Sequence, residues 1–185
     1  MEKMSINAKE REWALPSVTL RCFAGATILA LCSQISIPWL PIPFTLQTLG
    51  VSLIALALGP SERLFCVLLY LLEGACGMPV FAHFSGGLWE IAGPTGGYLV
   101  GFLPMVYLTG ILISRLKTKS PVHFFVAGLA GTLPLYLCGY LHLAAFVGFS
   151  EAYRLGIQPF WMTGFLKGLL FSVLASHWNQ WKFSR

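Results

Sequence analysis

Long apolar runs fill most of this chain, and nearly all of its charged residues fall between those runs or at the two ends. Apolar residues make up 56% of the 185 positions, charged residues make up 10%, and there is no aspartate. A soluble domain carries about a quarter charged residues, so this chain cannot cover its apolar surface with a hydrated shell. The sequence therefore predicts an integral membrane protein that resides in a lipid bilayer and has no room for a sizeable soluble domain.

The apolar runs suit six helical spans of about 20 residues each. Prolines and polar turns delimit spans at 18–36, 45–58 and 64–77, a fourth that ends near 114, a fifth at 122–149 with a kink at Pro134, and a sixth at 162–177. We expect an all-α integral membrane bundle of six transmembrane helices. The predicted divisions are an N-terminal segment at 1–17, a transmembrane domain at 18–178 and a tail at 179–185.

The cationic residues lie mainly on one side of the predicted bundle. Only Arg154 falls in a loop on the other side, and Lys167 lies inside an apolar run. This asymmetry places both termini in the cytoplasm, and the net charge of +5 then does not imply nucleic-acid binding. The residues on the cytoplasmic side are Lys3, Lys9, Arg11, Arg21, Arg63, Arg115, Lys117, Lys119, Lys182 and Arg185.

Several function classes lack their characteristic motifs in this sequence. The five cysteines have no C-x-x-C spacing and the four histidines are scattered, which disfavours a disulfide framework or a metal site. There is no G-x-S-x-G turn and no G-x-x-x-x-G-K-[ST] phosphate loop. We therefore expect neither an enzyme nor a cofactor, and no removable signal peptide at the charged N-terminus.

Two charged side chains lie within predicted spans, and they are the strongest candidates for a functional site. A lysine at the centre of a membrane helix costs about 2.5 to 3.5 kcal/mol on insertion scales, so Lys167 should face a partner or a wet cavity. Glu73 and Lys167 each lie six residues from the same membrane face, at roughly 9 Å depth. We therefore expect an ion pair between them, although snorkelling of the lysine and a purely structural glutamate remain alternatives.

Amides and small residues mark further candidate contacts. Gln34 and Gln47 flank the proline-rich turn 38–43 and could hydrogen-bond a cyclic amide or urea, although glutamines also join membrane helices. Ala26 and Ala30 lie on one face of the first span, where small residues allow close approach of either an internal helix or another subunit. Glycines spaced by four should form a second smooth stripe, at Gly93, Gly97 and Gly101.

Three short blocks appear in the same order in a known family. They are PFTLQ at 43–47, GMPVF at 77–81 and GPTGGY at 93–98, the last followed by Gly101 and Phe102. Together they resemble the BioY family of biotin transporters, whose members are the biotin-specific substrate-binding (S) components of energy-coupling factor (ECF) transporters. The resemblance covers about residues 20 to 178.

The resemblance implies a six-helix S component that binds biotin from the outside. It also implies two kinds of partner, a transmembrane coupling subunit and two ATP-binding subunits, with Ala26 and Ala30 docking on the coupling subunit. The family's last helix resembles PF-x-x-x-D-x-x-K, in which Lys167 matches but Gly164 replaces the acid. Our hypothesis is that Glu73 supplies the displaced carboxylate and that His83 replaces another polar contact.

The chemistry of biotin is compatible with the candidate residues. Its ureido group needs donors and an acceptor, its thiophane ring needs apolar walls, and its carboxylate needs a cation. Lys167 could meet a charge, while Phe81 and Trp89 suit the ring. The ureido group or the carboxylate could be bound by Gln47, Glu73, His83 and Tyr98. Two alternatives remain open, an S component for another small vitamin and a membrane scaffold that transports nothing.

Overall fold

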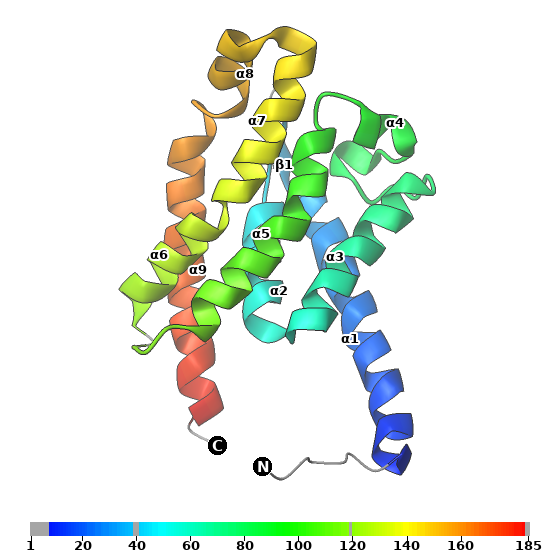
Figure 1. Ribbon diagram of the computed structural model, residues 1–185, viewed down its shortest axis with the longest axis vertical. Helices are drawn as coiled ribbons and strands as arrows, with labels where there is room; N and C mark the ends of the chain where they lie inside the picture. Colours follow the sequence, from blue (N-terminus) through cyan, green and yellow to red (C-terminus); the bar gives the residue numbers. More distant parts are fainter. Residues whose placement is uncertain (1–7, 39–40, 119, 184–185) are drawn as a thin grey trace.

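A computed structural model describes residues 8–38, 41–118 and 120–183, so the expectations for Lys3, Lys119 and Arg185 lie outside the described residues. These residues form a bundle of helices and one two-residue hairpin (Figure 1). The longer helices are α1 (Ala8–Gln34), α2 (Gln47–Ala57), α3 (Pro60–Ala75), α5 (Gly96–Ser114), α6 (Pro121–Gly131), α7 (Leu133–Val147) and α9 (Phe160–Phe183). The shorter elements are β1 (Ser36–Ile37), β2 (Phe44–Thr45), η1 (Ala82–Phe84), α4 (Leu88–Ala92) and α8 (Phe149–Gly156).

The predicted all-α membrane class is confirmed. Within the described residues, three helical stretches are long and apolar enough to cross a bilayer, namely Gly96–Ser114, Pro121–Val147 and Phe149–Trp178. Two further apolar helices, Val18–Gln34 and Gln47–Ala57, are shorter than a full span. The expected count of six spans is therefore not shown in full. The helices α2 and α3, with 11 and 16 residues, are short, as the bounds 45–58 and 64–77 predicted.

Local sequence signals explain most of the helix ends. Pro60 and Pro121 occupy the first turns of α3 and α6, where the missing N–H costs nothing. Pro134 follows the break between α6 and α7, at the predicted kink in the fifth span. The loop expected after that span instead folds into α8, which begins after Gly148 at φ 81°, a conformation that glycine adopts readily.

The helices pack around α5 and α2. On one side α3 packs against α1 and α5, and on the other α9 packs against α6 and α2 (Figure 1). Two glycines of the predicted stripe, Gly97 and Gly101, form a packing surface on α5, whereas Gly93 ends α4 and lies outside that helix. A Cβ at Gly97 would collide with the Cys138 carbonyl and with His142, and one at Gly101 would press on the backbone of Leu135. Glycine therefore allows α5 and α7 to approach closely.

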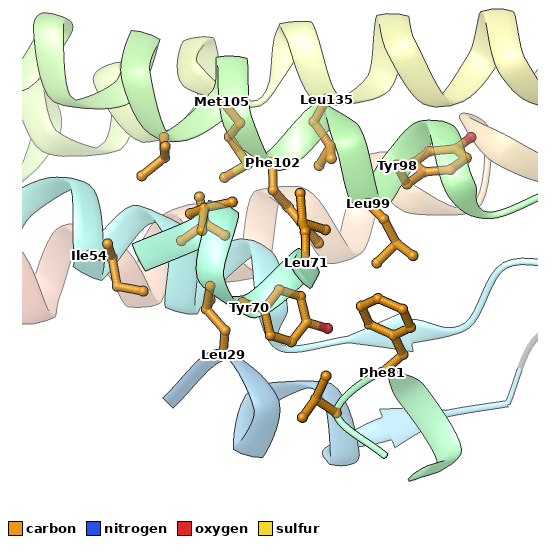
Figure 2. Packing of buried hydrophobic residues seen from close by; sticks show 14 of the residues in the cluster. Leu29, Ile54, Tyr70, Leu71, Phe81, Tyr98, Leu99, Phe102, Met105 and Leu135 are labelled. Atoms are coloured by element: carbon orange, nitrogen blue, oxygen red, sulfur yellow. The ribbon is translucent and has the colours of Figure 1, made fainter. Parts of the chain in front are cut away.

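The apolar core lies between these helices and extends towards one end of the bundle. Leu29, Ile54 and Tyr70 form one side of it, and Met105 and Leu135 are contributed by the opposite helices (Figure 2). The same end of the bundle carries the β1–β2 hairpin and the connection from α3 through α4 to α5 (Figure 1). We call this end the loop end.

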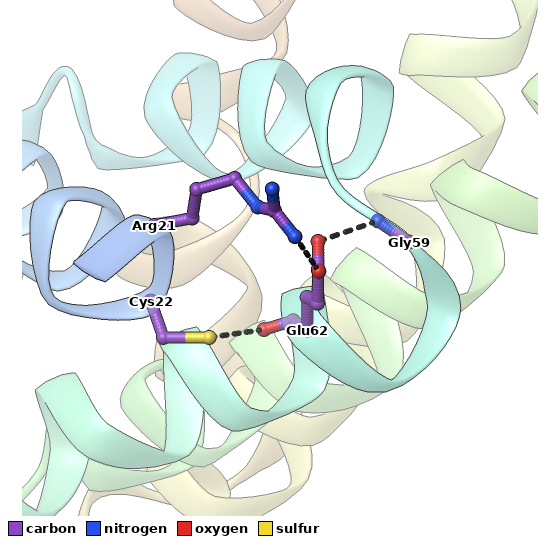
Figure 3. A network of polar contacts seen from close by, with 4 residues as sticks. All are labelled: Arg21, Cys22, Gly59 and Glu62. Carbon is purple, nitrogen blue, oxygen red and sulfur yellow. Dashed lines mark hydrogen bonds and ion pairs between the residues drawn. The ribbon is translucent and has the colours of Figure 1, made fainter. Parts of the chain in front are cut away.

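A polar network joins α1 to the start of α3 away from the loop end. The Glu62 carboxylate accepts hydrogen bonds from the Arg21 guanidinium and from the Gly59 N–H, the latter at 3.3 Å (Figure 3). The Cys22 thiol donates to the Glu62 carbonyl at 3.7 Å. The contacts of Glu62 with Arg21 and Cys22 hold the first turn of α3 against α1.

The small-residue stripe on α1 has an internal partner, which corrects the docking expectation that came from the family resemblance. Ala26 is fully buried, and a Cβ added at Gly25 would meet the Cys66 thiol of α3. Ala30 is partly buried and packs against the same core. The stripe therefore brings α3 close to α1, and Ala26 is not exposed for a second subunit.

Substituting Gly97 with alanine tests the α5–α7 contact. We expect Gly97→Ala to destabilise the fold by about 1 to 3 kcal/mol, because the added methyl group forces the two backbones apart. Thermal unfolding of purified protein in detergent would measure the change. Gly164→Ala is the control, since its Cβ meets only the Tyr136 hydroxyl, at 3.3 Å. Equal melting temperatures for the two variants would contradict the predicted contact.

Candidate substrate-binding site

A cavity of about 330 Å³ opens at the loop end, a volume within the range of small-molecule sites. Its walls come from α2, α5, α7 and α9, and its rim comes from the connections before α2 and before α5. The lining side chains include Pro38, Pro41, Ile42, Pro43, Thr45, Gln47, Thr48, Phe81, Ala82, His83, Ser85, Glu90, Thr95, Tyr98, Leu99, Phe102, Leu135, Tyr136, Phe160 and Lys167.

Four polar lining residues, Gln47, Thr48, Tyr136 and Lys167, are together called the floor. Three of them, Thr48, Tyr136 and Lys167, also line a smaller void that lies between α2, α6 and α9. Lys167 lies seven residues into α9, roughly 10 Å along the helix from its first residue. Its ammonium forms no ion pair with any described residue. The Thr48 hydroxyl is buried and has no hydrogen-bond partner within the described chain. The floor thus offers donors and acceptors inside an apolar bundle.

Neighbouring hydroxyl groups fix the orientation of the Gln47 amide. Its NH₂ group donates to the Tyr70 hydroxyl at 2.6 Å, and its oxygen accepts from the Thr45 hydroxyl at 2.8 Å. Gln47 is only 5% exposed. An amide held by two partners keeps its remaining hydrogen and lone pair in fixed directions, which suits recognition of a cyclic urea or amide.

Aromatic rings form one wall of the cavity around Phe160. The Phe160 ring lies 4.5 Å from the Phe44 ring and 6.4 Å from the rings of both Tyr98 and Tyr136, measured between centroids. The Tyr98 hydroxyl donates to the Gly156 carbonyl at 2.9 Å, which ties this wall to the end of α8. The wall suits an apolar ring system.

The segment 80–84 covers the opposite side of the cavity, and the C-terminal end of α1 holds it there. The Gln34 amide donates to the Phe81 carbonyl at 2.9 Å and accepts from the Phe84 N–H at 3.0 Å. The Ser33 hydroxyl donates to the Val80 carbonyl at 2.6 Å. The Phe81 ring packs edge-on against Tyr70, with 5.5 Å between centroids. Gln34 therefore clamps this segment over the site.

The backbone within the covering segment adopts an unusual conformation. His83 and Phe84 have φ values of 60° and 57°, in the left-handed region that non-glycine residues rarely occupy. Such residues cost of order 1 to 3 kcal/mol each and persist only where the surroundings hold them. The two hydrogen bonds of Gln34 provide that restraint on either side of His83.

The structure brings five of the seven predicted site residues to one cavity. These five are Gln47, Phe81, His83, Tyr98 and Lys167. Trp89 does not line the cavity, because α4 turns its side chain outward with 71% of its surface exposed. The segment that contains Trp89 does border the cavity, as the sequence predicted, but the Trp89 side chain points away from it.

The expected ion pair between Glu73 and Lys167 is not formed, and Glu73 does not line the cavity. Glu73 belongs to α3 and Lys167 to α9, which lie on opposite sides of α2 and α5 (Figure 1). Equal depth in the membrane therefore does not bring them together. The hypothesis that Glu73 replaces the acid at position 164 is corrected accordingly. Gly164 itself borders a void of about 20 Å³ beside Lys167.

The cavity also contains residues that sequence reasoning did not select. Thr48 and Tyr136 complete the floor, while Ser85, Glu90 and Thr95 lie nearer the rim. Thr48 carries a weak signal as the neighbour of Gln47, and Glu90 carries one as an acid within the apolar segment 78–98. Tyr136 carries none, because its direction depends on the break between α6 and α7. In the described chain, no cluster of metal-ligating side chains was found.

The fold and the cavity define a class of protein, a multi-pass membrane bundle with a small-molecule site at one end. The profile described as the BioY family matches residues 4–183, so the chain belongs to the BioY family. The three sequence blocks that resemble this family all line or border the cavity, since Pro43, Phe81 and Tyr98 are among its walls.

Relatives agree with this assignment, and a solved structure shares the fold. The chain is 38% identical to "Biotin transporter BioY2" of Lactococcus lactis, over 82% of this chain and 84% of that protein. It is 36% identical to "Biotin transporter BioY" of Thermotoga maritima, over 80% and 87% of the two chains. A crystal structure of "the S-component for biotin from an ECF-type ABC transporter" shares the fold, with a TM-score of 0.78, 22% identity and 95% of both chains covered.

Removing the Gln34 clamp should weaken ligand binding without unfolding the bundle. We expect Gln34→Ala to lower the affinity of the cavity for its ligand by at least about 5-fold, since the two lost hydrogen bonds contribute about 0.5 to 1.5 kcal/mol each. Equilibrium binding to purified protein would measure it. Thr27→Ala is the control, because the Thr27 hydroxyl bonds only the Phe23 carbonyl of its own helix. Equal affinities for both variants would exclude a clamp.

Proposed function

We propose that this protein is the biotin-binding S component of an ECF-type vitamin uptake transporter. The observation that carries the proposal is a lysine, Lys167, that lines a cavity inside a membrane bundle and has no carboxylate partner among the described residues. Such a cation is costly unless a ligand or water reaches it. Membership of the BioY family and the names of the relatives support biotin as the ligand and transport as the activity, in place of catalysis.

The charge distribution supports a direction for the cavity. Arg21, Arg63, Arg115 and Lys117 belong to the part of the chain away from the loop end, whereas Arg154 lies on α8 at the loop end. Cationic loops favour the cytoplasmic side of a membrane. The loop end then faces the outside, and biotin enters the cavity from there. The same asymmetry supports cytoplasmic locations for segments 1–17 and 179–185.

The chemistry of the cavity supports one orientation of biotin. The floor combines the Gln47 amide, the Thr48 and Tyr136 hydroxyls and the Lys167 ammonium, and this mixture matches the two N–H donors and one carbonyl acceptor of a ureido group. The aromatic wall around Phe160 suits the thiophane ring. The valerate tail of biotin then points towards the rim.

Transport requires energy that this chain has no motif to supply. The sequence contains no ATP-binding loop, and ECF-type transporters are classed as ABC transporters in the description of the similar structure. We propose that a transmembrane coupling subunit and two ATP-binding subunits supply the energy. Because Ala26 is buried, the coupling subunit has to bind elsewhere on α1 or on another helix.

Substitution of Lys167 tests the proposed site. We expect Lys167→Ala to lower biotin affinity by at least about tenfold, which corresponds to about 1.4 kcal/mol, because the floor loses its charged donor. Equilibrium binding of labelled biotin to purified protein would measure the loss. Lys117→Ala is the matched control, since Lys117 is exposed in the turn after α5. Unchanged binding in the Lys167 variant would remove this lysine from the site.

A ligand screen tests the identity of the vitamin separately. A ligand present at 100 times its Kd adds about 2.7 kcal/mol to the free energy of unfolding, which raises the melting temperature. We expect biotin to produce this shift and other small vitamins to produce none. Stabilisation by a different vitamin alone would reassign the substrate, and stabilisation by no vitamin would favour a scaffold.

A further inference from the structure

Tyr136 brings a hydroxyl group to the part of the cavity where α9 has no side chain. Gly164 precedes Lys167 by three residues, so the two positions lie on one face of α9. A Cβ added at Gly164 would meet the Tyr136 hydroxyl at 3.3 Å. That hydroxyl therefore lies against the face of α9 that carries the lysine, in the space that a longer residue at position 164 would enter.

The Tyr136 side chain borders both open spaces of this region. It lines the cavity of about 330 Å³ and, together with Thr48 and Lys167, the smaller void of about 20 Å³. Its ring packs against that of Phe160, the first residue of α9, with 6.4 Å between centroids. This packing holds the hydroxyl where the two spaces meet.

The Tyr136 hydroxyl differs from those of the two tyrosines in the core cluster. The Tyr70 hydroxyl accepts a hydrogen bond from Gln47 at 2.6 Å, and the Tyr98 hydroxyl donates one to the Gly156 carbonyl at 2.9 Å. For the Tyr136 hydroxyl, the described part of the chain provides no such partner. A phenol hydroxyl both donates and accepts, so this one is available to water or to a ligand that enters the cavity.

We propose that the Tyr136 hydroxyl hydrogen-bonds the ligand beside Lys167, in place of a side chain at position 164. The inference rests on the proposed function. It holds for either orientation of biotin, because the ureido group and the carboxylate both offer an acceptor oxygen. The hydroxyl is neutral, so it adds a donor to the site without cancelling the charge of the lysine. A polar side chain at position 164 would compete with it for the same space.

Tyr136→Phe removes the hydroxyl and keeps the ring. We expect it to lower biotin affinity about fivefold, since one hydrogen bond is lost, and not to lower the melting temperature of the ligand-free protein. Equilibrium binding and thermal unfolding of the purified full chain would measure the two effects. Tyr140→Phe is the matched control and should change neither value. Tyr140 lies one turn further along α7, is partly buried against Phe149 and does not line the cavity.

A polar side chain at position 164 provides a test that a purely structural tyrosine would not pass. In the Tyr136→Phe background, Gly164→Asn places an amide in the vacated space, and we expect it to restore most of the lost affinity. In the wild-type background the same substitution crowds the hydroxyl and should lower affinity. The two effects of Gly164→Asn therefore have opposite signs. Equal effects in the two backgrounds would overturn the proposal.

Biotinamide, which lacks the carboxylate, identifies the ligand atom in contact. A similar loss for biotin and biotinamide in the Tyr136→Phe variant assigns the contact to the ureido group. A much larger loss for biotin assigns it to the carboxylate. Both results support the proposed hydrogen bond, because each requires the hydroxyl to contact the ligand.

The remaining outcomes separate this inference from the proposed function. Unchanged affinity for both ligands in the Tyr136→Phe variant would overturn the role of the hydroxyl while biotin binding stands. A lower melting temperature with unchanged affinity would overturn it too, because the hydroxyl would then serve only the fold. If Tyr136→Phe does not fold, unchanged biotin affinity in the Gly164→Asn variant overturns the inference. Failure of the wild-type protein to bind biotin would overturn the function itself.

Discussion

The structure depends on keeping one ammonium group inside an apolar bundle. A charge at this depth has to face protein or water, because lipid offers it no partner. The fold meets this requirement by leaving a cavity between α2, α5, α7 and α9, so that Lys167 projects into space that polar side chains line. Close packing surrounds that space, because glycines let α5 approach α7 and let α1 approach α3.

The covering segment and the floor are parts of one hydrogen-bonded system. Gln34 and Ser33 at the end of α1 hold residues 80–84, and Phe81 from that segment packs against Tyr70. The Tyr70 hydroxyl in turn accepts the hydrogen bond of the floor amide, Gln47. A displacement of the covering segment therefore disturbs the residue that orients the floor. We therefore expect a change in this segment to alter ligand recognition as well.

Sequence patterns predicted the features that depend on neighbouring residues in the chain. They did not predict which side chains from different helices contact one another. Hydropathy and proline positions predicted the membrane class, most helix ends and the break at Pro134. Depth along a helix also followed from residue counting, which is why Lys167 was expected well inside the bundle. The partner of a side chain depends on which helices are neighbours, and hydropathy does not contain that information. The pairing of Glu73 with Lys167 and the outward role of Ala26 were wrong for this reason.

Because Glu73 does not pair with Lys167, no carboxylate on the floor neutralises the lysine. Gly164 contributes no side chain beside Lys167, and the void there is about 20 Å³, large enough for one water molecule but not for a ligand. The described neighbours on the floor are neutral hydroxyl and amide groups, so the nearest acid that shares the cavity is Glu90 near the rim. Because no acid lies beside Lys167 on the floor, its charge remains available to a ligand. A carboxylate at position 164 would instead neutralise Lys167 locally.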